Sequence, residues 1–198
     1  MKSILSAPFA FSAYQLEDYI SEIESGIAIN KEEIKAIKEN PEAPNFNNTI
    51  AALDRSGQHL AKFSSAFFNL NASNTNEKWQ EAAQQIAPKL SNFSNDIILD
   101  QELFERIQTV YNTEALAGEA QMLLEKTFKK FTNNGALLRD NQKEELRKVD
   151  EKLSMLSVKF GSNVLADSNA YELHIQEEAK LEGLPQSAID AARLTAEQ

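Results

Sequence analysis

The chain has 198 residues, of which 42% are hydrophobic and 25% are charged, and its formal net charge is -10. This composition is typical of a globular protein, and a chain of this length buries roughly 70% of its unfolded surface in one domain. The acidic balance argues against nucleic-acid binding, which needs clustered lysine and arginine. Because the sequence contains no cysteine, it excludes disulfides, thiolate metal ligands and cysteine nucleophiles.

The N-terminal segment MKSILSAPFAF lacks an apolar run long enough for a signal peptide, and no window approaches the ~20 apolar residues of a membrane span. We therefore expect a cytoplasmic protein that does not enter membranes. A periplasmic location stays open as the alternative, if a signal peptide has been removed ahead of these residues.

The first predicted helix shows apolar residues at alternating steps of four and three from Leu16 to Ile37. Asn30 is the one polar residue on this face, and we expect it to be a hydrogen-bonded core residue or to fix the helix register. Asn40 and Pro41 end the helix, because the residue before a proline disfavours helical backbone.

A second helix is predicted from Ile50 to Leu70, after a loop with two prolines. We expect Asn47 and Asn48 to cap it by accepting hydrogen bonds from its first backbone N–H groups. Its broad apolar face includes three phenylalanines, which indicate core packing rather than a ligand pocket. Gly57 lies inside this pattern, where glycine costs about 1 kcal/mol relative to alanine, so we expect a close helix crossing there.

Helical spacing continues through a third, a fourth and a fifth segment. Pro88 lies inside the third and predicts a kink near residues 84–88. The fifth ends at Asn133-Asn134-Gly135, which supplies a C-terminal stop. The sixth helix is the longest, and its other face carries alternating charges expected to be solvated. Its apolar stripe, expected to be buried, consists of Leu146, Val149, Leu153, Leu156, Phe160 and Val164.

The period changes after Ser168, where apolar and polar residues alternate over residues 171–175 and predict a short strand. No second convincing strand exists to pair with it. Pro185 opens a last helix, which has no capping glycine or asparagine before Gln198, so we expect the natural chain to continue.

The predicted fold class is therefore all-α, a multi-helix bundle with about six or seven helices and at most one short strand near the C-terminus. We expect a single helical domain over residues 1–198, with the loop at 133–139 as the nearest approach to an internal boundary. A helical surface rich in lysine and arginine is expected to be solvated rather than a site for an acidic partner. Its members are Lys126, Lys129, Lys130, Arg139, Lys143, Arg147 and Lys148.

Residues with acid, base or ligand chemistry are few. Neither His59 nor His174 has a second histidine one helical turn away to complete a zinc ligand pair. The adjacent pairs Glu32-Glu33 and Glu177-Glu178 do not share a helix face, so no paired carboxylate chemistry is indicated. No glycine-rich phosphate loop or serine nucleophile motif is present. The sequence therefore assigns no catalytic, cofactor-binding or metal residues.

Several short motifs occur in a specific order along the chain. The most specific are Phe46-Asn47-Asn48-Thr49-Ile50 and Leu181-Glu182-Gly183-Leu184-Pro185. Between them lie Phe67-Phe68-Asn69-Leu70, residues 100–106 with Leu103-Phe104, and Phe160 with Asn163. With these motifs the chain resembles the N-terminal region of the thimet-oligopeptidase-like zinc metallopeptidases, most of all the bacterial peptidyl-dipeptidases.

The resemblance implies the non-catalytic N-terminal helical part of a larger peptidase, where it forms part of the wall of a channel for short peptides. The family binds zinc through a His-Glu-x-x-His helix that is absent here. We therefore expect zinc only in the parent enzyme, an inactive fragment, and the C-terminal catalytic part of the same polypeptide as partner. The alternative is a free-standing helical protein-interaction module. An enzyme in its own right is the weakest of the three hypotheses.

Overall fold

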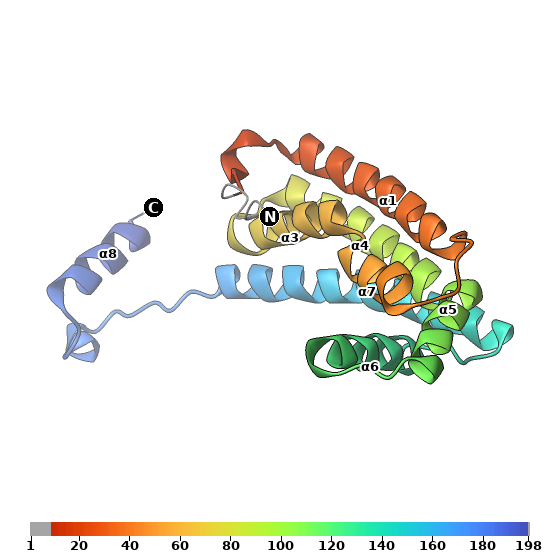
Figure 1. Cartoon of the computed structure of the whole chain (residues 1–198). Coiled ribbons are helices and arrows are strands. Elements are labelled where there is room, and N and C mark those ends of the chain that lie inside the picture. The colour runs from red at the N-terminus through yellow and green to blue at the C-terminus, as the bar shows by residue number, and fades with distance from the viewer. Residues whose placement is uncertain (1–8, 198) are drawn as a thin grey trace. The chain divides into compact units, whose positions relative to one another are not determined.

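A computed structural model describes residues 9–197, which form an all-α protein as predicted (Figure 1). The chain divides into two compact units, Met1–Ser162 and Asn163–Gln198, and the division falls inside a long helix. The described part of the second unit contains the end of α7, the short η3 Glu178–Leu181 and α8 Gln186–Ala196. The first unit contains η1 Phe11–Ala13, α1 Leu16–Lys38, η2 Phe46–Ile50, α2 Ala51–Arg55, α3 Gln58–Ser73, α4 Glu77–Ile98, α5 Gln101–Thr113, α6 Gly118–Asn133 and most of α7 Asp140–Ala170.

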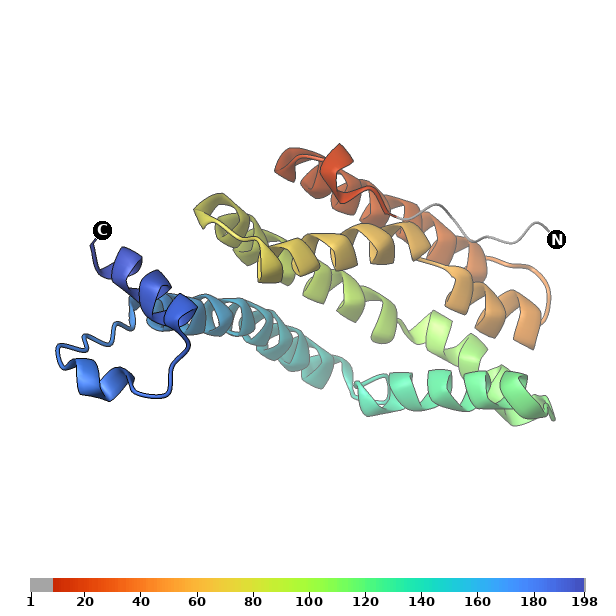
Figure 2. The same ribbon diagram turned by 90° about the vertical axis from the view of Figure 1, so that its left-hand side faces the viewer.

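One core of the first unit is aromatic and lies where α1, α3 and α4 run side by side (Figure 2). Phe67 and Trp79 stack with their ring centroids 5.2 Å apart. Tyr19 is fully buried among these rings, and its hydroxyl donates a hydrogen bond to the carbonyl of Phe11 at 3.2 Å. Burial, and next the charge of nearby Tyr14, raise the pKa of Tyr19. The phenylalanines of the second predicted helix are thus core residues, as expected.

A second core joins the C-terminal half of α1, η2, the end of α4, α5 and α6. Phe104 and Phe131 are 2% exposed and stack with their ring centroids 6.3 Å apart. Asp100 caps α5 by accepting a hydrogen bond from the N–H of Leu103 at 2.8 Å. The loop at 133–139, which connects α6 with α7, turns at Gly135 with a φ of 100°.

The cap before α2 differs from the prediction. Asn45, rather than Asn47 or Asn48, is the N-cap, and its side chain accepts a hydrogen bond from the N–H of Asn48 at 2.9 Å. The Asn48 side chain accepts one from the N–H of Asn45 at 2.9 Å in return. The two asparagines therefore form a capping box, in which Asn48 occupies the third helical position. This reciprocal pairing satisfies two backbone N–H donors with two side chains.

The second predicted helix is broken at Gly57, which corrects the expectation of a helix crossing there. Gly57 has a φ of 71°, a left-handed conformation that ends α2 and starts α3. The close crossing lies instead at Gly26 of α1, where an added Cβ would come within 2.9 Å of the Cα of Leu60. Asn30 is buried and hydrogen-bonded to Glu33, as expected of a core asparagine.

Two other expectations concern local geometry. Helix α4 continues through Pro88 without a break, and the kink near it stays a prediction. The strand predicted at residues 171–175 is wrong, since residues 171–177 have no regular secondary structure. An isolated alternating pattern needs a neighbouring strand to pair its backbone groups, and none exists in residues 9–197.

Candidate functional site

The side of α7 that faces the rest of the first unit is mostly polar. Lys143 is 8% exposed, and its ammonium group donates hydrogen bonds to the carbonyl of Leu99 at 3.0 Å and to Oε1 of Gln101 at 3.4 Å. A cation is favourable there because Leu99 is the C-cap of α4, the negative end of that helix. Arg147, one turn along, forms an ion pair with Asp96 at 2.8 Å.

Most of the apolar stripe of α7 is exposed and belongs to neither core. Val149 is 60% exposed, Leu153 58%, Leu156 51% and Phe160 71%. The prediction that this stripe is buried is therefore wrong for these four residues. Leu146 alone of the predicted stripe packs against a core of the first unit. We call Val149, Leu153, Leu156 and Phe160 the outer face of α7.

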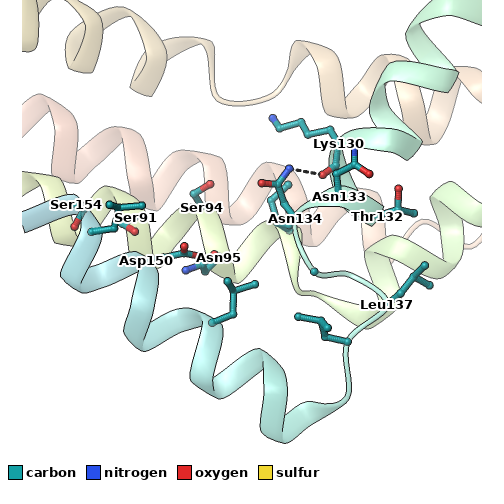
Figure 3. A pocket seen from close by; sticks show the side chains of 15 residues that line it. Ser91, Ser94, Asn95, Lys130, Thr132, Asn133, Asn134, Leu137, Asp150 and Ser154 are labelled. Atoms are coloured by element: carbon teal, nitrogen blue, oxygen red, sulfur yellow. Dashed lines mark hydrogen bonds between the residues drawn. The ribbon is translucent and has the colours of Figure 1, made fainter. Parts of the chain in front are cut away.

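A groove of about 660 Å³ adjoins this face, between α4, the loop after α6 and the first half of α7 (Figure 3). Leu153 and Asp150 of α7 line it together with Asn95 of α4. The Asn95 side chain is a polar group left unsatisfied, because residue Asn95 is 6% exposed and its Nδ2 has no hydrogen-bond partner in the described part of the chain. Among the described residues, Nδ2 of Asn95 is therefore a buried donor in the wall of the groove without an acceptor.

The second unit, taken by itself, has no buried residue among those that the structure describes. Tyr171 is 73% exposed, Leu173 68% and Leu194 64%. A segment of this length without a core does not hold a fold by its own burial, because ordering the backbone costs more free energy than exposed side chains return. Among the described residues, the outer face of α7 and the second unit, each taken by itself, therefore present exposed apolar side chains.

The other charged residues that the sequence analysis named are either exposed to solvent or bound to neighbouring residues. Lys126, Lys129, Lys130, Arg139 and Lys148 are exposed, as expected, but the buried Lys143 and the paired Arg147 do not belong to a solvated surface. Glu33 contacts Asn30 and Gly57, whereas Glu32 is exposed. Glu177 pairs with Lys180 at 3.0 Å, and the Glu178 side chain lies outside the described ones.

One ion-pair cluster fixes the end of α1 to the start of α5. The ammonium group of Lys38 lies 2.6 Å from the carboxylate of Asp100 and 2.9 Å from that of Glu102. The hydrogen bond to Asp100, followed by that to Glu102, raises the pKa of Lys38. These contacts stabilise the helix junction. The three side chains also line a small cavity of about 270 Å³ together with Phe93 of α4.

Comparison with known proteins places these features in a family. No protein-family model matches the chain. The chain is 32% identical to the dipeptidyl carboxypeptidase of Escherichia coli over 88% of its own length and 26% of that protein. It is 31% identical to the dipeptidyl carboxypeptidase of Salmonella typhimurium over 91% of its length and 27% of that protein. The chain belongs to the thimet-oligopeptidase family.

Another relative has a lower sequence identity to the chain. Oligopeptidase A of Haemophilus influenzae is 27% identical over 77% of the chain and 23% of that protein. The chain spans about a quarter of the length of the curated relatives it matches. The resemblance drawn from the sequence motifs is thus confirmed.

The motifs that carry the resemblance have structural roles in this family member. Phe46–Ile50 forms η2, the capped turn that enters α2. Arg106, at the end of the motif at residues 100–106, donates hydrogen bonds to the carbonyls of Asn40 at 3.1 Å and Glu42 at 3.4 Å. Arg106 therefore holds the loop between α1 and η2 in place. These motifs specify how the helices connect, and they contain no reactive constellation.

The two histidines lie in different environments. His59 lies against Phe63, and its Nε2 is 2.8 Å from a carboxylate oxygen of Glu22. His174 is exposed and lies 3.1 Å from Glu172. No group of three histidine, cysteine, aspartate or glutamate side chains suited to a metal ion occurs in residues 9–197. The described residues therefore do not fit the family's zinc.

Within the described residues, none of the helices is both long and apolar enough to span a bilayer. The apolar residues of the outer face of α7 alternate with polar ones around the helix, which is the pattern of a protein contact.

Proposed function

We propose that the chain is the non-catalytic N-terminal helical part of a zinc-dependent peptidyl-dipeptidase or oligopeptidase that cleaves short peptides. In this proposal it forms part of the wall of the substrate channel, and its partner is the C-terminal catalytic part of the same polypeptide. The zinc and the residues that activate water belong to that other part.

The observation that carries the proposal is the asymmetry of the match to the Escherichia coli dipeptidyl carboxypeptidase. The alignment covers 88% of this chain but 26% of that protein. A peptidase needs a nucleophile or an activated water, and the described residues supply neither a metal ligand set nor a triad. Catalytic residues in the rest of such a protein would explain both the partial coverage of the relative and the missing ligand set in this chain.

The structure of the first unit suits a wall rather than a reaction centre. Its two cores contain large apolar side chains, and its polar contacts, such as the ion pair of Lys38 with Asp100, join one helix to the next. Rigid helices that exclude folded proteins but admit extended peptides would give an oligopeptidase its preference for short substrates.

The test starts from the complete reading frame that contains this sequence. We expect it to encode a His-Glu-x-x-His motif beyond Gln198, and the purified full-length protein to hydrolyse short unstructured peptides in a zinc-dependent manner. A folded globular protein, offered as a control substrate, should stay intact. A reading frame that stops at Gln198, or a full-length protein without peptidase activity, would count against the proposal.

A second candidate function is a free-standing helical interaction module, favoured by the exposed outer face of α7. The same observation fits both proposals, so the reading frame separates them. A stop codon after Gln198 together with a complementary helical protein encoded nearby would favour the module. We also propose a cytoplasmic location, which fractionation of cells that express the complete gene tests directly.

A further inference from the structure

We propose that the outer face of α7 and the groove beside it are the surface on which the remainder of the polypeptide docks, through a helix of its own. The occupant is the part of the full-length family member that lies outside this chain. This inference rests on the proposed function, because it takes that longer polypeptide to exist.

The spacing of the outer face indicates a helical partner. Val149, Leu153, Leu156 and Phe160 follow one another at steps of four, three and four, the repeat that seats one helix against another. Each of them is more than half exposed, at 60%, 58%, 51% and 71%. A monomeric protein seldom leaves a continuous apolar stripe of this kind in water, so the stripe is covered in the complete protein.

The charge along α7 supports the same conclusion. Charged residues are frequent from Asp140 to Lys152, but Lys159 is the one charged residue from Ser154 to Ala166. The scarcity of charge in the half of α7 that carries Leu156 and Phe160 favours a protein contact, because a solvated helix carries charge.

The groove contains a hydrogen-bond donor for which the docking helix is expected to provide an acceptor. Nδ2 of Asn95 is a buried donor without a partner among the described residues, and a donor left in that state lowers the stability of the fold. Asn95 lines the groove together with Leu153 of the outer face. The docking helix is therefore expected to place apolar side chains on the stripe and one carbonyl or carboxylate oxygen in the groove.

Two observations favour the rest of the polypeptide over a second copy of the chain. The chain spans 26% of the Escherichia coli relative, so the larger part of such a protein is available as a cover. The second unit has no buried residue in its described part, and it too requires a cover. A second copy brings its own uncovered second unit with it, whereas the remaining length of a family member can cover both surfaces.

The absence of cysteine in this chain permits a direct test by thiol labelling. Leu156→Cys is introduced into the chain of 198 residues and into the full-length protein, and maleimide modification of the peptide with residue 156 is followed by mass spectrometry. Ile29→Cys on α1 is the matched control, because Ile29 is 43% exposed and Leu156 is 51% exposed.

We expect labelling at residue 156 to be at least about tenfold slower in the full-length protein than in the chain alone, the factor for an opening free energy of about 1.4 kcal/mol. Labelling at residue 29 should be equally fast in both. Leu156→Asp provides a second measurement: it should lower the thermal midpoint of the full-length protein by several degrees and leave that of the chain alone unchanged. Ile29→Asp should change neither midpoint as much.

Three results separate the inference from the proposal on which it rests. Equal labelling of residue 156 in both proteins, in a full-length protein that cleaves peptides, would overturn the docking surface and leave the peptidase function intact. Protection of residue 156 in a full-length protein without peptidase activity would support the docking surface and count against that function. A chain that dimerises alone and protects residue 156 in its dimer would show that a second copy is the occupant, which overturns the inference.

Discussion

The carboxylate of Glu33 on α1 accepts a hydrogen bond from the backbone N–H of Gly57 at 2.7 Å. The same oxygen accepts another from the side chain of Asn30 at 3.0 Å. Gly57 is the N-cap of α3, so a negative charge lies at the positive end of that helix. The Glu33 carboxylate thus satisfies the backbone N–H at the break between α2 and α3, and it links this break to α1.

Substitution of Gly57 should be among the more damaging small changes in the first unit. Gly57→Ala forces alanine to a φ of 71° and brings its Cβ within 2.9 Å of Oδ1 of Asn30. We expect a loss of about 1–2 kcal/mol from the backbone alone, measured by urea unfolding. Gly161→Ala is the matched control and should stabilise by about 0.5–1 kcal/mol, because Gly161 is helical and open. A similar effect of both changes would contradict the proposed turn.

Two phenylalanines provide a test of which helix faces are covered in the chain alone. Phe67 is fully buried, whereas Phe160 is 71% exposed. Phe67→Ala should lower the free energy of unfolding by about 3–5 kcal/mol, and Phe160→Ala should change it by less than about 0.5 kcal/mol. Denaturant midpoints of the two variants give the comparison. If Phe160→Ala proves as costly as Phe67→Ala, the outer face of α7 is buried within the chain and the docking surface is wrong.

The Lys38 cluster predicts a specific pH dependence. Its hydrogen bonds to Asp100 and Glu102 raise the pKa of Lys38 above the usual 10.5. A raised folded pKa means that the stabilisation is fully present below the unfolded pKa and is lost as the pH rises through the folded one. Lys38→Met should therefore cost about 1 kcal/mol at neutral pH, and less once the pH exceeds about 10.5.

This dependence is measured by urea unfolding of the wild type and Lys38→Met from neutral pH to about pH 11.5. The difference between the two should stay constant up to about pH 10 and shrink beyond it. A difference that persists to the highest pH would show that packing of the Lys38 stem, rather than its charge, joins α1 to α5.

We predict that the isolated chain holds no stoichiometric zinc and cleaves no peptide. The physical reason is that His59 and His174 each contact a single carboxylate and have no second histidine at ligand spacing. Metal analysis of tag-free protein, with a peptide-cleavage assay on the same sample, provides the measurement. One tightly held zinc per chain, removed by chelator with loss of activity, would disprove it.

Local patterns in the sequence determined much of this protein. The apolar steps from Leu16 to Ile37 predict α1, whose bounds are Leu16–Lys38. The aromatic residues of the second predicted helix predict the core that contains Phe67. The family follows from motifs such as Phe46–Ile50 because these fix caps and turns, which depend on neighbouring residues.

Tertiary structure alone decided which side of each pattern is covered. The steps from Leu146 to Phe160 show that these side chains share a helix face. Lys143 and Arg147, however, bind groups at the end of α4 and the start of α5, and so a polar side of α7 faces inward. The break at Gly57 likewise depends on the carboxylate of Glu33, which is 24 residues away in the sequence. Periodicity reports which residues lie together, whereas burial depends on surfaces supplied by distant parts of the chain.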